Sequence, residues 1–207
     1  MRKCRFLKSF FAKFFCVCLL LLFYGCITSS KVSYFTLDVK QPLIESNGEK
    51  NICLEVVSIK LSEPLKRKEI MFRSSSVEIG YYSEYLWASS IEEMVALRFN
   101  KYFSCPGVKI KPDYYLHIDL LNFEQEVSPE GSRAIVSMKI EILNPEDMKL
   151  ISQRYYTEVE VINSEDIVET VTKLSRATDK IIIRVEKDIS EYVRGSSQVG
   201  GRTDAPH

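Results

Sequence analysis

The sequence RAIVSMKIEIL at residues 133–143 alternates apolar and polar side chains with a period of two. Successive side chains of a strand point to opposite faces of a sheet, so the alternation predicts a β-strand with one covered face. The apolar side is formed by Ala134, Val136, Met138, Ile140 and Ile142, and the polar side includes Ser137, Lys139 and Glu141. The stretch therefore indicates a sheet that buries one face and leaves the other in water.

Two further stretches, at residues 114–126 and 150–161, alternate in the same way. The apolar face of the first is expected to hold Leu116, Ile118 and Leu120. That of the second is expected to hold Ile151, Tyr155, Val159 and Val161, opposed by Arg154, Glu158 and Glu160. The links at 127–132 and 144–149 carry Pro, Gly, Asn and Asp, which favour hairpin turns. The three strands are therefore predicted to run antiparallel.

Two segments repeat their apolar residues at helical spacing. Ser90 and Glu93 have the spacing of a capping box, and an amphipathic helix is expected over 91–103. Its buried face would be formed by Ile91, Met94, Val95, Phe99 and Tyr102. A second helix is expected after Ser164 as its N-cap, with Ile167, Val171, Leu174, Thr178, Ile181, Val185 and Ile189 on one face. At about 26 residues and roughly 39 Å, this helix is long enough to cover a sheet.

The remaining elements are expected to be strands at 34–37 and 51–61 and two short strands within 70–82. The predicted fold class is α+β: a largely antiparallel, meandering sheet with two amphipathic helices packed on one face. This domain is expected to span residues 34–192, followed by a disordered tail at 193–207.

Lysine and arginine crowd the start of the chain, and a short apolar run at 14–23 follows. A basic segment, a short apolar segment and a small residue are typical of an export signal. Gly25 before Cys26 fits the lipobox of bacterial lipoproteins, so we expect a signal peptide at 1–25 and lipidation at Cys26. Residues 26–33 would form the lipidated tether. A signal anchor and simple secretion are the alternatives, although a spanning helix needs about 20 apolar residues.

The first 25 residues hold 5 of the 28 basic residues and none of the 28 acidic ones, so the mature chain would be acidic. A globally basic nucleic-acid binder is thereby excluded. Attachment to anionic lipid by charge is also disfavoured, which leaves the acyl chains on Cys26 as the membrane attachment.

Two cysteines, Cys53 and Cys105, remain in the mature chain beyond Cys26. An exported protein occupies a compartment in which disulfides persist, so a bridge between them is one reading. A half-buried free thiol at Cys53 is equally ordinary. The sequence leaves both readings open.

Residues that would support catalysis or metal binding are scarce. The mature chain has two histidines: His207 ends the chain, and His117 is expected on the polar face of a strand as a structural residue. No phosphate-binding glycine loop, dinucleotide turn or nucleophile elbow is present. We therefore expect no enzyme, no metal site and no cofactor beyond the diacylglycerol and acyl lipid on Cys26.

Aromatic residues cluster just before the first predicted helix, where Tyr81, Tyr82, Tyr85 and Trp87 fall within seven positions. Such residues are enriched at interaction surfaces, so Tyr85 and Trp87 are candidates for binding a partner. The alternative is that Trp87 packs beneath the helix that follows it.

The order of these features resembles the ABC-type transport auxiliary lipoprotein family, the Pqi-type lipoproteins that partner MCE lipid-transport systems. The resemblance covers roughly residues 34–190. The residues that carry it are Cys26, the strand Tyr34-Phe35-Thr36-Leu37, Val56-Val57, the stretch from Leu65 to Arg73, Tyr85-Leu86-Trp87-Ala88, and Leu97 to Phe103 at the helix end. The alternating strands and the long C-terminal helix complete the pattern.

The resemblance implies a non-catalytic lipoprotein at the outer membrane, facing the periplasm of a Gram-negative bacterium. Ile27 after the acylated cysteine favours sorting to that membrane. An inner-membrane ABC permease and ATPase would supply energy, and an MCE-domain protein would carry phospholipid or other hydrophobic cargo between the membranes. A homo-oligomer is possible in such a system. A structural or assembly lipoprotein, or a domain that binds lipid itself, is the competing interpretation, and cargo and direction stay open.

Overall fold

The structure, a computed structural model, describes residues 31–37, 52–103 and 111–199. Within these ranges the order of elements is β1 (Ser33–Phe35), β2 (Leu54–Leu61), a short 3₁₀ turn η1 (Glu63–Lys66), β3 (Glu69–Arg73), β4 (Ile79–Trp87), α2 (Ile91–Tyr102), β5 (Tyr114–Ser128), β6 (Gly131–Leu143), β7 (Leu150–Ile162) and α3 (Ile167–Val199). The predicted signal peptide, Cys26 and Cys105 lie outside the described residues.

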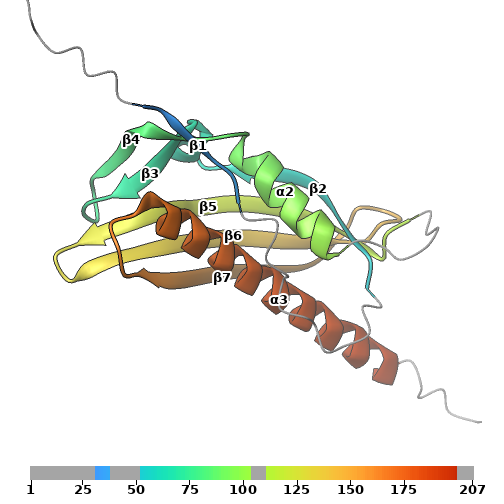
Figure 1. Cartoon of the computed structure of the whole chain (residues 1–207). Coiled ribbons are helices and arrows are strands. Elements are labelled where there is room, and N and C mark those ends of the chain that lie inside the picture. The colour runs from blue at the N-terminus through green and yellow to red at the C-terminus, as the bar shows by residue number, and fades with distance from the viewer. Residues whose placement is uncertain (1–30, 38–51, 104–110, 200–207) are drawn as a thin grey trace, which may run out of the picture. The chain divides into compact units, whose positions relative to one another are not determined.

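The strands form one mixed, mostly antiparallel sheet, which confirms the α+β class (Figure 1). Its order is β1-β4-β3-β5-β6-β7, and β2 also pairs with β5. The contacts β3–β4, β5–β6 and β6–β7 are antiparallel, whereas β1–β4, β2–β5 and β3–β5 are parallel. The predicted meander therefore holds only for β5, β6 and β7, because the long strand β5 carries both β2 and β3 on its other edge.

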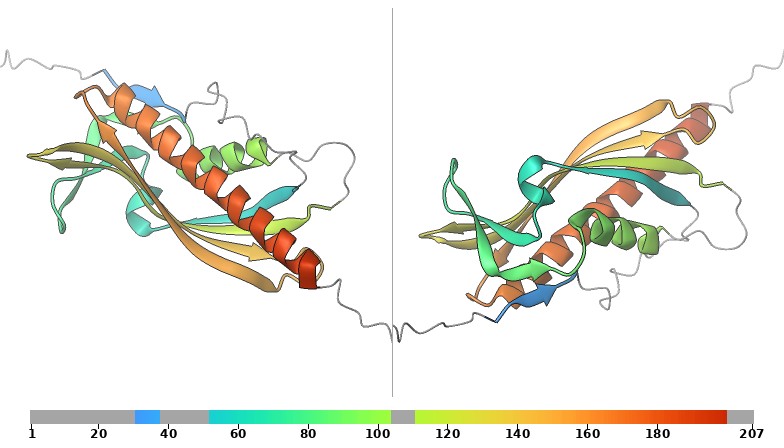
Figure 2. Two further views of the ribbon diagram at one scale, coloured as in Figure 1. Left: turned by 90° about the horizontal axis from the view of Figure 1, so that it is seen from below. Right: turned by 90° about the horizontal axis from the view of Figure 1, so that it is seen from above.

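Both helices cover the same face of the sheet, as predicted (Figures 1 and 2). All five apolar residues predicted for the inner face of α2 and all seven predicted for α3 are buried. They meet the buried residues of the central strands, which include Leu116, Ile118, Leu120, Val136, Met138 and Ile140. A register shift between Leu120 and Asn122 leaves Leu121 exposed and brings Phe123 into the core. One extra residue in a strand reverses its inner and outer positions in this way.

The ends of the long helix α3 differ from the prediction. Asp166 caps its start by accepting the backbone N–H of Val168 at 2.9 Å, whereas the expected cap Ser164 accepts the N–H of Asp166 at 3.3 Å. At its other end the helix continues to Val199, so the disordered tail does not begin at residue 193. Ile189 is buried and Val193 is half-buried against the core, which favours continuing the helix past residue 192.

The predicted faces of β7 are reversed at three of the four apolar positions, whereas Ile151 is half-buried and packs against the core. Tyr155, Val159 and Val161 are exposed, by 66%, 46% and 60%, instead of lying in the core. Glu158 and Glu160 face α3, where they pair with Arg184 at 2.7 Å and Lys180 at 2.5 Å. The apolar stripe of α3 packs on the buried side of the sheet, while its basic flank lies over β7. The inner side of this outermost strand therefore combines buried Tyr156 and Ile162 with the charged Glu158 and Glu160.

Cys53 is disulfide-bonded, which answers the open question at that residue. It is buried directly before β2, and its backbone N–H donates at 2.8 Å to the carboxylate of Asp113, which lies just before β5. A disulfide at this position fits a chain that folds in an oxidising compartment.

Candidate functional site

The two residues predicted to contact a partner lie on β4 but differ in exposure. Trp87 is only 2% exposed and packs against Phe123 with ring centroids 5.6 Å apart. Its indole belongs to the hydrophobic core, so the alternative interpretation, that Trp87 packs inside the domain, describes it correctly. A side chain buried to this extent offers no area for a partner to cover.

Tyr85 is half-buried and belongs to a row of aromatic rings at the β1 side of the sheet. Its ring meets Phe35 of β1 edge-on at 5.9 Å and Tyr82 at 5.4 Å, and Tyr82 in turn meets Phe72 of β3 at 4.9 Å. Burial raises the pKa of Tyr82, whose hydroxyl donates to Gln125 at 2.9 Å. These rings join three strands, and β1 is the strand that directly follows the predicted tether.

The opposite edge of the sheet carries the surface that sequence reasoning missed. We call the exposed residues Tyr155, Val159 and Val161 the β7 outer face. No described strand pairs with the outer edge of β7, which pairs with β6 alone. An unpaired edge strand with apolar side chains is a template for pairing with another chain. The alternation of apolar and polar residues in this stretch predicts a strand, but it does not say which of the two sides of that strand faces the core.

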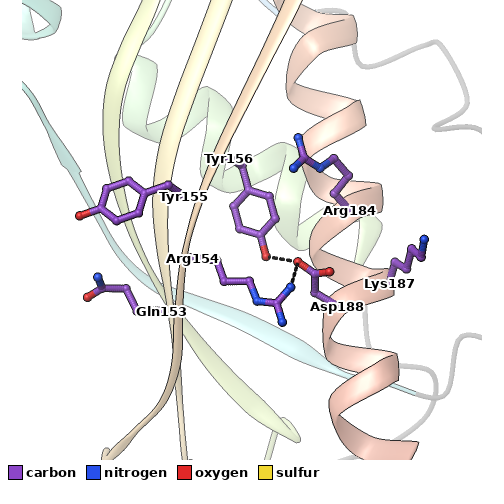
Figure 3. Close-up of a pocket in the computed structure, with 7 residues that line it drawn as sticks. All are labelled: Gln153, Arg154, Tyr155, Tyr156, Arg184, Lys187 and Asp188. Atoms are coloured by element: carbon purple, nitrogen blue, oxygen red, sulfur yellow. Dashed lines mark hydrogen bonds and ion pairs between the residues drawn. The ribbon is translucent and has the colours of Figure 1, made fainter.

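A hollow of about 450 Å³ opens beside this edge, between β7 and α3 (Figure 3). The residues that line it are Gln153, Arg154, Tyr155, Tyr156, Arg184, Lys187 and Asp188. Figure 3 shows Tyr155 and Gln153 on one side of the strand and the α3 residues on the other. The hollow therefore reaches across the free edge of β7.

Three cations and one carboxylate set the electrostatics of the hollow. Asp188 accepts the Tyr156 hydroxyl at 2.8 Å and lies 2.9 Å from Arg154. Burial, and then the bond to Asp188, raise the pKa of Tyr156, so its hydroxyl stays protonated. Arg184 pairs with Glu158, but Lys187 has no ion-pair partner among the described residues. The hollow thus has an excess of positive charge and suits a carboxylate or another anion.

His117 lies on the uncovered face of the sheet, as predicted, between two hydrogen-bond partners. Its Nδ1 is 2.5 Å from the Ser58 hydroxyl, and its Nε2 is 3.2 Å from Asp119. The residue types match a serine–histidine–aspartate triad. However, Lys139 binds the Asp119 carboxylate at 2.6 Å, and all four residues occupy neighbouring positions on paired strands. This geometry is that of a cross-strand network that ties β2, β5 and β6 together.

Acid is expected to weaken this network through Asp119. Burial raises the pKa of Asp119, but the bonds from Lys139 and His117 outweigh it and hold the pKa below its ordinary value. Such a carboxyl stabilises the fold above its ordinary pKa, and the contribution is lost as the pH falls through the lower folded value. Lys139→Met should raise the pKa of Asp119, so the acid loss of stability should begin at a higher pH.

Thermal unfolding midpoints measured over an acid pH series test this expectation. Lys66→Met is a suitable control, since Lys66 pairs only with exposed Glu63. Superimposable pH curves for Lys139→Met and the unchanged protein would contradict the assigned role of Lys139.

Two features are absent from the described part of the chain. It contains no group of three or more His, Cys, Asp or Glu side chains placed to hold a metal ion. In the same residues, no helix combines the length and apolar character needed to cross a membrane.

Comparison with known proteins gives one family and a set of similar folds. Residues 35–185 match the family model described as the ABC-type transport auxiliary lipoprotein component. The structure resembles a Xanthomonas campestris protein of family DUF330, at 19% identity and a TM-score of 0.61, over 82% of this chain and 97% of that one. It also resembles an uncharacterized protein at 14% identity and a TM-score of 0.60, over 77% and 99% of the two chains. Among curated proteins there is no match.

Proposed function

The chain belongs to the ABC-type transport auxiliary lipoprotein family, and on this basis we propose that it is a membrane-anchored, non-catalytic adaptor of an ABC/MCE-type transporter. In this role it is tethered through lipid on Cys26 to the outer membrane and faces the periplasm. It docks one end of an MCE-domain conduit whose inner-membrane permease and ATPase move phospholipid or other hydrophobic cargo between the membranes.

The family match carries this proposal, because it extends from β1 to the C-terminal half of α3 and so spans nearly the whole described domain. The export signal and lipobox before residue 27 support the anchor. The disulfide at Cys53 supports an oxidising compartment such as the periplasm.

Replacing Cys26 tests the anchor. Full-length protein produced in a Gram-negative host should incorporate radiolabelled palmitate and sediment with the outer membrane. Cys26→Ala should lose both the label and the membrane fraction, whereas Cys18→Ala, inside the apolar run, should keep them. Equal labelling of the Cys26→Ala variant would show that the lipid is elsewhere and would contradict this part of the proposal.

We place Tyr85 near the contact with the MCE partner. Its ring is half-buried beside Phe35, at the edge of the domain that begins where the tether ends. A photo-reactive phenylalanine analogue at position 85 should crosslink the MCE-domain protein in intact cells, and one at exposed Tyr192 of α3 should not. Crosslinking from position 192 but not from position 85 would remove Tyr85 from the contact.

A further inference from the structure

The start of β1 lies at the same end of the domain as two hairpin turns and the start of α3 (Figures 1 and 2). Strand β1 is parallel to β4 with Ser33 beside Tyr85, so the chain enters β1 from the side on which β4 begins at Ile79. Strand β3 is parallel to β5 with Arg73 beside Glu126, which puts the β3–β4 turn level with the β5–β6 turn. Strand β7 ends beside the start of β6, so the link to α3 is there too. We call this the tether end, formed by the start of β1 and residues 74–78, 128–131 and 163–166.

The predicted tether limits how far this end can lie from a membrane. Seven peptide units join Cys26 to Ser33, which is about 25 Å at full extension. Along β4 the position of Ile79 is six residues from Tyr85, the partner of Ser33, and so at most about 20 Å away. Leu150 at the opposite end starts β7, whose thirteen residues span about 40 Å. The lipid on Cys26 therefore keeps the tether end near a membrane, whereas the opposite end reaches the membrane only if the domain lies flat.

Exposed apolar side chains are more frequent at the tether end than at the opposite end. Val77, in the β3–β4 turn, is 91% exposed, more than any other large hydrophobic residue of the described chain. The other exposed apolar residues at or next to this end are Val32, Ile79, Val127, Val161 and Val168. Those at the opposite end are Met148, Leu150 and Tyr192. Exposed apolar side chains of this kind can enter the boundary between lipid headgroups and acyl chains.

The β3–β4 turn holds Val77 outward while it satisfies polar groups of its own. The Ser74 N–H donates to the Glu78 carbonyl at 3.1 Å, and the Ser74 hydroxyl donates to the Glu78 carboxylate at 2.8 Å. The Ser75 hydroxyl accepts the Glu78 N–H at 3.2 Å. Polar groups that have partners lose less when they leave water, so this turn can approach acyl chains at a low cost.

The charges of the tether end disfavour an anionic surface. Glu78, Glu130 and Asp166 are exposed there, and the exposed Arg133 already pairs with Glu126 at 2.5 Å. These carboxylates would be repelled by anionic headgroups. A zwitterionic lipid surface can meet the apolar side chains without that cost.

We propose that the tether end rests on a zwitterionic lipid surface, with Val77 at the boundary between headgroups and acyl chains. This inference rests on the proposed lipid anchor at Cys26, which supplies most of the affinity. The tether makes the contact intramolecular, so a small apolar surface is enough to orient the domain. The contact stands the domain upright and holds its opposite end, where β7 begins, about 40 Å further from the lipid.

Quenching of tryptophan by brominated lipid tests the contact on the full-length, lipidated chain. The chain has a single tryptophan, Trp87, which is buried and contributes a constant background. Val77→Trp protein in phosphatidylcholine vesicles should lose most of its added emission when the acyl chains are brominated. Leu150→Trp is the matched control, because Leu150 is also apolar and exposed but lies at the opposite end, and it should lose none. Vesicles that also contain phosphatidylglycerol should give no stronger quenching.

Flotation of the same samples distinguishes failure of this inference from failure of the anchor. A lipidated chain that floats with the vesicles, but in which Val77→Trp is quenched no more than Leu150→Trp, would overturn the inference and leave the anchor in place. Quenching at position 77 that requires phosphatidylglycerol would also overturn it, because the contact would then be made by charge. A chain that does not float would overturn the anchor at Cys26 and this inference with it.

Discussion

Asp179→Ala is expected to lower the free energy of unfolding by about 3–5 kcal/mol, because it removes the carboxylate that pairs with the buried Arg98 guanidinium. Arg98 of α2 is 5% exposed and Asp179 of α3 is 7% exposed. The guanidinium binds the carboxylate through two nitrogens, Nε to Oδ1 and Nη2 to Oδ2, the latter at 2.5 Å. This pair, with the Tyr102 hydroxyl bonded to Glu186, joins the two helices that cover the sheet. Chemical denaturation monitored by circular dichroism measures the loss.

A double variant distinguishes the buried charge from lost packing. Replacing both partners by apolar residues, Arg98→Met with Asp179→Leu, should recover most of the stability, since no unpaired charge remains. Glu63→Ala, which breaks an exposed pair with Lys66, should cost far less. An Asp179→Ala variant as stable as Glu63→Ala would contradict the role of this pair.

Trp87→Ala is expected to cost about 3–5 kcal/mol of unfolding free energy, because it removes a large aromatic side chain from a closely packed core. The indole is 2% exposed and contacts Phe123, the residue that the bulge in β5 turns inward. Trp87→Phe keeps an aromatic ring beside Phe123 and should lose less. Denaturation of both variants, compared with Tyr85→Ala, measures the difference.

This expectation changes how Trp87 can be used in binding experiments. A loss of partner recovery with Trp87→Ala would follow from partial unfolding and would say nothing about a contact. Tyr85→Ala removes a half-buried ring and should leave the protein folded. If Trp87→Ala unfolds at the same denaturant concentration as the unchanged protein, then the indole is not part of the core as described.

The sequence was sufficient to predict the elements whose patterns are local. Alternation located β5, β6 and β7, and helical spacing located every buried position named for α2 and α3. The Ser90 cap is confirmed, with its hydroxyl accepting the Glu93 N–H at 3.2 Å. These features depend on residues that are only a few positions apart, so they can be recognised from the sequence alone.

What the sequence did not predict depends on contacts between distant segments. The parallel pairing of β2 and β3 with β5 has no local signature. The inner side of β7 is set by the basic flank of α3, which turns Glu158 and Glu160 inward and Tyr155 outward. The burial of Trp87 likewise depends on Phe123, 36 positions along the chain. The alternating pattern therefore predicts Tyr155, Val159 and Val161 in the core, whereas in the structure they form an exposed surface on β7.

The most direct test of the proposed role is recovery of partners with the full-length chain. Envelopes of the native bacterium would be crosslinked briefly, the tagged chain purified, and the recovered proteins quantified by mass spectrometry against an unrelated lipoprotein tagged in the same way. An adaptor of an ABC/MCE-type transporter should enrich an MCE-domain protein together with its permease and ATPase. Recovery of the folded, lipidated chain with none of these proteins enriched would contradict the account.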